Sequence, residues 1–77
     1  MSSPGMHIID FHGLQHADVE NELVRKINYL WDTGTELMII TGNSDQMKDI
    51  VMKVLYEHKL QYTIGDALNK GYIKTVI

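Results

Sequence analysis

The residues best suited to chemistry in this sequence are an aspartate and a histidine two positions apart, Asp10 and His12. Side chains alternate between the faces of a β-strand, so residues two apart project side by side. Histidine titrates near neutral pH, and a neighbouring carboxylate can fix its tautomer, which suits such a pair to proton transfer. The structural alternative is that both side chains only satisfy backbone groups where the strand ends.

A metal site is another interpretation of the same region, because four potential ligands lie within ten residues: His7, Asp10, His12 and His16. His7 and His12 have opposite strand parity, however, and a glycine turn separates His12 from His16. Neither pair has the helix-face geometry of common ligand pairs. The spacing therefore does not favour a metal site, and we predict no metal ligands.

A second candidate region is the turn Thr41-Gly42-Asn43-Ser44-Asp45, between an expected strand and an expected helix. Free backbone amides at a helix N-terminus can bind a phosphate. Lys48 follows one turn into that helix, within reach of the same crevice. The turn has a single glycine and the carboxylate of Asp45 opposes an anion, so an ordinary capped turn is the alternative.

Hydrophobic patterning predicts the elements that must position these residues. Four short apolar runs are typical of strands, and two stretches with apolar residues three to four apart are typical of helices. In chain order we predict strand 6–11, helix 17–33, strand 36–41, a helix capped by Asn43 or Ser44 with Asp45 in its first turn, strand 60–64 and strand 72–77. Gly34 is expected to cap the first helix, and residues 65–71 are expected to form a loop.

This order predicts an α/β fold, a two-layer βαβαββ sandwich with a four-stranded mixed sheet and two helices on one face. The first two strands should be parallel with a right-handed crossover, and the last two should form an antiparallel hairpin. Asp10 and His12 would then lie on the open face, near the carboxyl end of the first strand. The Thr41-Gly42 turn would lie close by, where open α/β sheets usually bind ligands.

One hydrophobic core is expected between the sheet and the helices. The first helix contributes a stripe of apolar residues to this core. Trp31 is also expected in the core, and Tyr29 is expected at the flank of the stripe. The expected core residues are Ile9, Phe11, Val19, Leu23, Ile27, Leu30, Ile39, Ile50, Val51, Val54 and Leu55.

Length and composition limit the function classes. The 77 residues suffice for one domain, predicted over residues 6–77 after a disordered start at 1–5. The absence of cysteine excludes disulfides, thiolate nucleophiles and zinc fingers. The net charge of −3 means that any nucleic-acid contact must come from a local cluster. No apolar run approaches the roughly 20 residues of a membrane span and no signal peptide is evident, so we expect a cytoplasmic protein without a membrane partner.

Residues 8–14, Ile-Ile-Asp-Phe-His-Gly-Leu, resemble the opening LDLHGL motif of the Smr (small MutS-related) domain family. Residues 37–42 resemble the family's second motif, an apolar strand that ends in a (H/T)GxG turn, and residues 71–77 resemble its closing strand. The resemblance covers residues 7–77 in the family's order. The further glycine and the basic residue of the second motif are replaced here by Asn43, Ser44 and Asp45.

The resemblance implies a stand-alone Smr-like domain, with a sandwich similar to the C-terminal domain of bacterial translation initiation factor three. It implies binding to DNA or RNA and, in many members, endonuclease activity, as used in DNA repair or RNA processing. The catalytic roles carry over to Asp10 and His12. Nucleic-acid contacts are expected from Gly13, Thr41, Gly42, Asn43 and Lys48.

Because the net charge of −3 opposes an anionic partner, we expect weak binding that requires low salt. Because the second motif is altered, we expect cleavage that is slow or absent. Cleavage would be metal-independent or weakly assisted by a divalent cation, Mg²⁺ or Mn²⁺. The alternative function is a non-catalytic protein–protein interaction module, in which the open sheet face or an edge strand binds a protein partner.

Overall fold

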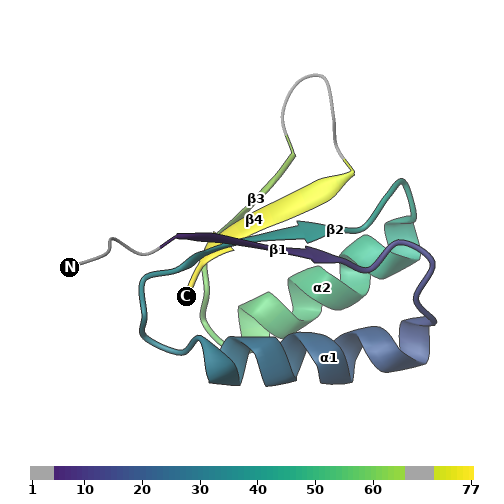
Figure 1. The fold of residues 1–77 in the computed structure, drawn as a ribbon. Helices are drawn as coiled ribbons and strands as arrows, with labels where there is room; N and C mark the ends of the chain where they lie inside the picture. The colour runs from purple at the N-terminus through teal and green to yellow at the C-terminus, as the bar shows by residue number, and fades with distance from the viewer. Residues whose placement is uncertain (1–4, 66–70) are drawn as a thin grey trace.

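The computed structural model describes residues 5–65 and 71–77 and has two helices and four strands (Figure 1). The elements are β1 (Met6–Asp10), α1 (His16–Tyr29), β2 (Glu36–Ile40), α2 (Asp45–Glu57), β3 (Tyr62–Ile64) and β4 (Tyr72–Val76). This order confirms the predicted α/β fold with a four-stranded mixed sheet. Apart from Gly5, the predicted disordered start lies outside the described residues, as do residues 66–70 of the predicted loop.

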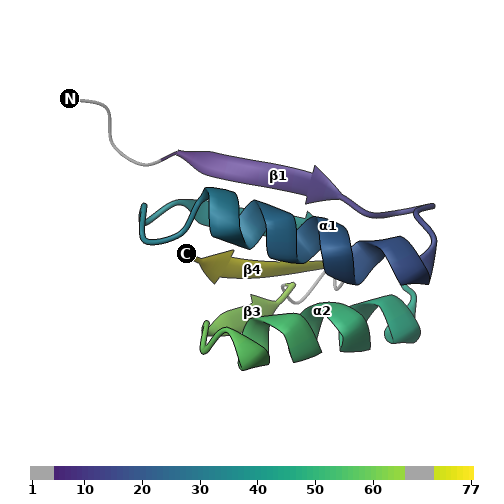
Figure 2. The same ribbon diagram turned by 90° about the horizontal axis from the view of Figure 1, so that it is seen from below.

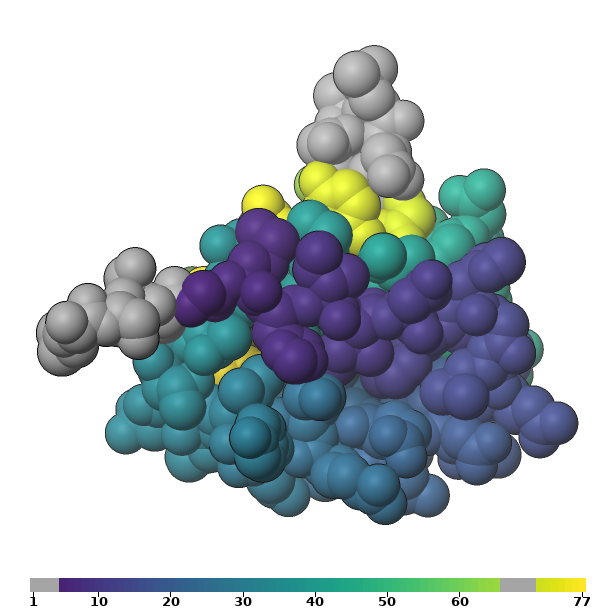
Figure 3. All heavy atoms as spheres, in the orientation of Figure 1, coloured from purple at the N-terminus to yellow at the C-terminus, as the bar shows by residue number. Residues whose placement is uncertain are grey.

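The sheet has the strand order β1-β2-β4-β3. As predicted, β1 pairs with β2 in parallel and β3 pairs with β4 in an antiparallel hairpin. The last strand inserts between β2 and β3, and it pairs antiparallel with β2. The strands β2 and β4 are therefore central, whereas β1 forms an edge whose atoms line the front of the space-filling view (Figure 3).

Both helices pack side by side on one face of the sheet (Figures 1 and 2). Each follows a strand through a short turn and runs back along it, so both helices begin at the end of the sheet where β1 and β2 finish. No described element covers the other face. No helix in the described ranges is long and apolar enough to cross a membrane.

The core lies between the sheet and the two helices. Three predicted members, Ile9, Leu30 and Ile50, are only partly buried and pack against its margin. The completely or nearly buried apolar residues are Phe11, Val19, Leu23, Ile27, Leu37, Ile39, Met47, Val51, Val54, Leu55, Ile73 and Ile77. The members not predicted include Leu37 and Ile73, which belong to the central strands and point toward the helices.

The end of the first helix was predicted wrongly. Helix α1 ends at Tyr29 rather than at residue 33, and Gly34 lies beyond its end. The Thr33 hydroxyl donates to the Leu30 carbonyl at 2.7 Å, and Asp32 has a φ of 60°, so the chain turns away from the helix axis. Trp31 is therefore 52% exposed instead of buried in the core, and its ring lies 6.4 Å from that of His58.

The central position of Leu23 generates a prediction about stability. Leu23 is completely buried beneath the sheet, so Leu23→Ala should lower the free energy of unfolding by about 2–5 kcal/mol. Urea denaturation followed by circular dichroism measures this loss. Tyr56→Ala is the control, because Tyr56 is 78% exposed on α2 and its truncation should change stability by roughly 0.5 kcal/mol at most. Equal losses in the two variants would contradict the described core.

Candidate functional site

The predicted site residues gather where β1 and β2 end. The backbone N–H of Phe11 donates to the Ile40 carbonyl at 2.9 Å, which keeps the two strands together beyond the last residue of β1. Phe11 is buried in the core and anchors the start of the following turn. We call the surface formed by His12, Gly13, Gly42 and Asn43 the strand-end surface.

The alternation predicted for the first strand is confirmed. Asp10 and His12 are exposed, whereas Phe11 between them is buried against the helices. The backbone turns directly after His12, where the Leu14 N–H donates to the Phe11 carbonyl at 2.9 Å and Gly13 has a φ of 86°. An aspartate and a histidine are thus presented to solvent at the end of the strand.

Asp10 contacts the backbone of His12 and not its ring. The Asp10 Oδ1 atom accepts a hydrogen bond from the His12 backbone N–H at 2.8 Å. Within the described ranges, no hydrogen bond reaches the His12 imidazole. The Asp10 carboxylate therefore satisfies a backbone group where the strand ends and stabilises the turn that carries His12, as in the structural alternative given above.

Gly42 brings the two candidate regions into contact. A Cβ atom built on Gly42 would lie 3.2 Å from the Cδ2 atom of His12, so the imidazole rests against the Gly42 backbone. Gly42 also has a φ of 66°, in the region that favours glycine. The absence of a side chain at this position is what allows the His12 ring to lie over the turn after β2.

Thr41 is turned inward. It is 1% exposed, and its hydroxyl donates to the carbonyls of Gly42 at 3.1 Å and Gly71 at 3.3 Å. The backbone N–H groups of Thr41 and Gly42 also donate to the Gly71 carbonyl, at 2.9 and 3.0 Å. Thr41 therefore holds the turn against the start of β4, and its hydroxyl and these two amides are already paired within the protein.

The start of α2 offers the remaining backbone donors. Ser44 is the N-cap, and its hydroxyl accepts from the Met47 N–H at 3.2 Å, as a capping residue should. The amides of Asp45 and Gln46, in the first turn, have no acceptor within the helix. Asn43 is exposed beside them, and Lys48 is half-buried one turn further along.

The described charges around this surface are mostly negative. Asp45 lies in the first turn of α2 and Asp18 in the first turn of α1, and Asp10 is exposed at the end of β1, whereas Lys48 contributes one positive charge. The ion pairs found in the described part of the chain, Arg25–Glu22 and Lys74–Glu36, both lie elsewhere. Among the residues that the structure describes, the strand-end surface therefore has backbone donors and an imidazole, but no basic cluster.

The histidines and carboxylates of this region do not converge. Among the residues that the structure describes, no three histidine, aspartate or glutamate side chains lie close enough together to hold a metal ion. Asp10 and His12 thus form no part of a ligand cluster in the described chain.

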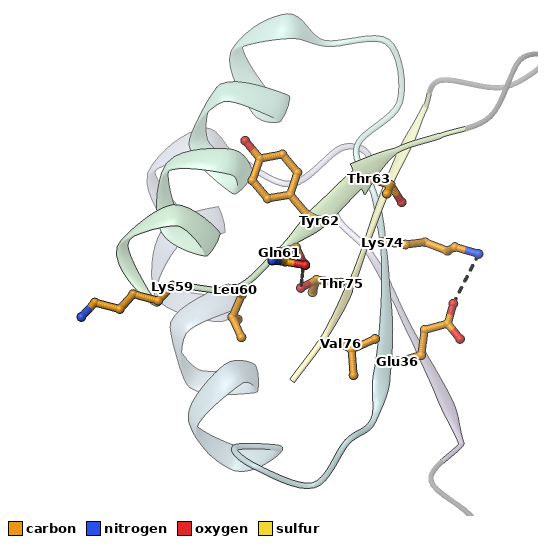
Figure 4. A pocket seen from close by; sticks show the side chains of 9 residues that line it. All are labelled: Glu36, Lys59, Leu60, Gln61, Tyr62, Thr63, Lys74, Thr75 and Val76. Atoms are coloured by element: carbon orange, nitrogen blue, oxygen red, sulfur yellow. Dashed lines mark hydrogen bonds and ion pairs between the residues drawn. The ribbon is translucent and has the colours of Figure 1, made fainter.

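A groove of about 470 Å³, which the sequence did not indicate, lies at the opposite end of the sheet (Figure 4). The Lys74 ammonium and the Glu36 carboxylate, 3.3 Å apart, form one side of it. On the other side, the Thr75 hydroxyl donates to the Gln61 carbonyl at 2.6 Å. Glu36 and Lys74 are brought together by the antiparallel register of β2 and β4, which sequence spacing alone cannot specify.

No family model, curated protein or solved structure matches this chain. The Smr resemblance therefore stays a prediction from the two motifs. What the structure adds is that these motifs, about 30 residues apart in sequence, meet at the contact between His12 and Gly42.

Two glycine substitutions distinguish the stability cost of disturbing the His12–Gly42 contact from the cost of backbone strain. Gly13→Ala meets no atom within 4 Å, so it should lower stability only through its positive φ, by about 1–2 kcal/mol. Gly42→Ala has the same strain and must also displace the His12 ring, so its loss should be larger. Urea denaturation gives the two losses, and NMR shifts of the His12 ring protons report displacement. An unmoved His12 ring in Gly42→Ala would contradict the described contact.

Proposed function

We propose that this domain binds the phosphate backbone of DNA or RNA at the strand-end surface, as an Smr-like domain, and that His12 supports slow phosphodiester cleavage there. The observation that carries the proposal is the packing of the His12 ring against Gly42. It places a side chain capable of proton transfer directly beside the turn that leads into the start of α2.

The direction of the helices supports phosphate binding at this end. Both α1 and α2 begin at the strand-end side of the molecule (Figures 1 and 2). Helix N-termini carry a partial positive charge, and their unpaired amides are suitable donors to an anion. A phosphate near Asn43 would meet the first-turn amides of α2, with Lys48 one turn away.

The same surface limits affinity. One lysine and a few amides neutralise few phosphates, and the carboxylates of Asp18 and Asp45 oppose them. The net charge of −3 adds a general repulsion. Binding supported by so few contacts is weak and depends on low salt.

Charge substitutions at the start of α2 should change the affinity in opposite directions. Lys48→Gln should weaken binding several-fold and make the salt dependence less steep by about one phosphate contact. Asp45→Asn should strengthen binding, because it removes a charge that repels phosphate. Fluorescence titration of labelled RNA and DNA hairpins between low and moderate salt measures both effects.

Lys59→Gln is the matched control for this titration. Lys59 is exposed near the groove at the opposite end of the sheet, so its loss changes net charge without touching the strand-end surface. A protein that binds neither hairpin at low salt, or that responds equally to both lysine substitutions, would contradict the proposed surface.

In the proposed cleavage, His12 and Asp10 have different roles. His12 would take a proton from the attacking hydroxyl or give one to the leaving oxygen, as a general base or acid. Asp10 would be a positioning residue, because its carboxylate holds the His12 backbone. One such proton transfer contributes typically 10²–10⁴-fold in rate, and donors at the turn would have to stabilise the developing charge.

Variants of the first motif test these roles. His12→Ala should reduce cleavage by about 10²–10⁴-fold while binding persists. Asp10→Asn should retain much of the activity, because an amide oxygen can still accept from the His12 N–H, whereas Asp10→Ala should lose it. Cleavage of single-stranded and branched substrates, assayed at pH 5–9 with and without Mg²⁺ or Mn²⁺, measures these rates.

Two results would overturn the cleavage part of the proposal. One is a His12→Ala variant as active as the unaltered protein. The other is an unaltered protein that leaves every substrate intact, which would leave binding alone.

A protein-interaction module is the second candidate function, and it has its own supporting observation. On the uncovered face of the sheet, Met6, Ile8 and Val76 are 50%, 57% and 58% exposed. Failure to bind nucleic acid at low salt would favour this alternative.

A further inference from the structure

The outer edge of β1 is an unpaired strand edge. Within residues 5–65 and 71–77, β1 pairs only with β2, and its other side has no partner strand. In the view from below, β1 lies beyond α1 at the margin of the molecule, so the helix layer does not overhang it (Figure 2). No described element therefore covers this edge along Met6–Asp10.

The hydrogen bonds to β2 show which residues of β1 direct their backbone outward. The Glu36 N–H donates to the Gly5 carbonyl, and the Phe11 N–H donates to the Ile40 carbonyl. Backbone groups alternate in direction along a strand, so the odd-numbered residues bond to β2. Met6, Ile8 and Asp10 consequently direct their N–H and C=O groups toward the open edge.

This edge has few of the features that usually prevent strand pairing. Proteins protect edges with charged side chains, especially lysine, and with proline, bulges or very short strands, and the one carboxylate of β1, Asp10, lies at its end. The sequence of β1, Met-His-Ile-Ile-Asp, contains no lysine or proline, and its register with β2 is continuous without a bulge. The opposite edge is protected by length, since β3 has only three residues.

We propose that two copies of this chain pair through β1 as antiparallel strands, about a two-fold axis at Ile8. In this register Ile8 lies opposite Ile8 of the second copy, and Met6 lies opposite Asp10 of the second copy. All three outward-directed residues then form hydrogen-bonded pairs, so the dimer uses every available backbone group of the edge. The two sheets join into one of eight strands with all four helices on the same face.

This register keeps the like charges on the two copies of β1 apart. Asp10 is the only carboxylate on β1, and the pairing separates the two Asp10 carboxylates by about four residues of strand, or roughly 13 Å. At the centre, two isoleucine side chains that are 57% exposed in the single chain cover each other. Cross-strand pairs of β-branched residues are a stabilising contact in sheets.

The interface is small, so the dimer is transient. One strand pair buries less than a standard protein–protein interface, and affinity at this size is low. We expect a monomer–dimer equilibrium that moves toward dimer as protein concentration rises through the micromolar to millimolar range. The strand-end surface stays outside this interface, so the inference is independent of nucleic-acid binding.

Charge substitutions at the centre test the register by sedimentation equilibrium across protein concentrations. Ile8→Lys should be monomeric at all concentrations, because it places two ammonium groups opposite each other. Ile8→Glu should also be monomeric, because it places two carboxylates opposite each other. An equimolar mixture of these two variants should dimerise again. Val76→Lys is the matched control, because Val76 is equally exposed on the same face but lies on a central strand, and it should dimerise as the unaltered chain does.

A single cysteine provides a second measurement, because the chain contains none. Directly opposed strand residues are close enough for a disulfide, so Ile8→Cys should form a covalent dimer on mild oxidation much faster than Val76→Cys does. Equal rates of cross-linking in the two variants would overturn the proposed register. An unaltered chain that stays monomeric at millimolar concentration, or a mixture of charge variants that does not dimerise, would overturn the proposal itself.

Discussion

The arrangement of the candidate site depends on one backbone carbonyl, that of Gly71. It accepts hydrogen bonds from the N–H groups of Thr41 and Gly42 and from the Thr41 hydroxyl. These bonds fasten the end of β2 to the start of β4, so the chain turns at Gly42 beside β1 instead of continuing as a strand. Because Gly42 is held there, the ring of His12 can rest on its backbone. A contact between the first two strands is therefore fixed by the last one.

The insertion of β4 between β2 and β3 also determines which surfaces remain open. Two central strands place Leu37, Ile39 and Ile73 under the helices, and both helices are needed to cover them. No helix is left for the other face, where apolar side chains stay partly exposed. Phe11, directly after β1, lies in the core, whereas the outer side of β1 has no partner strand among the described residues, so Asp10 and the neighbouring His12 lie at an edge of the sheet.

Local patterning was sufficient to predict the succession of helices and strands, but it did not predict that β4 lies between β2 and β3. The period of apolar residues gave both helices, and alternation placed Phe11 inward with Asp10 and His12 outward. The predictions that were wrong, such as the end of α1 and the burial of Trp31, depended on contacts between distant residues or on backbone geometry. Trp31 continued the apolar stripe of α1, but the backbone leaves the helix before it.

The partners within the candidate site were even less predictable. Spacing suggested that the Asp10 carboxylate would orient the His12 ring, yet the nearer donor is the His12 backbone N–H. The inward rotation of Thr41 depends on Gly71, which lies 30 residues away in sequence. Spacing on one strand shows which side chains share a face, but it does not show which hydrogen-bond partner each one takes.

Helix stability and phosphate binding place opposite demands on the strand-end surface. Asp18 and Asp45 lie in the first turns of α1 and α2, where a negative charge interacts favourably with the helix dipole. Each contribution of this kind is typically about 0.3–1 kcal/mol, which matters in a domain this small. The same carboxylates reduce the positive potential that the helix N-termini would offer to a phosphate. These carboxylates stabilise the helices partly at the expense of anion affinity, so the proposed contact with a phosphate backbone would have to come from oriented amides, Lys48 and His12 rather than from net charge.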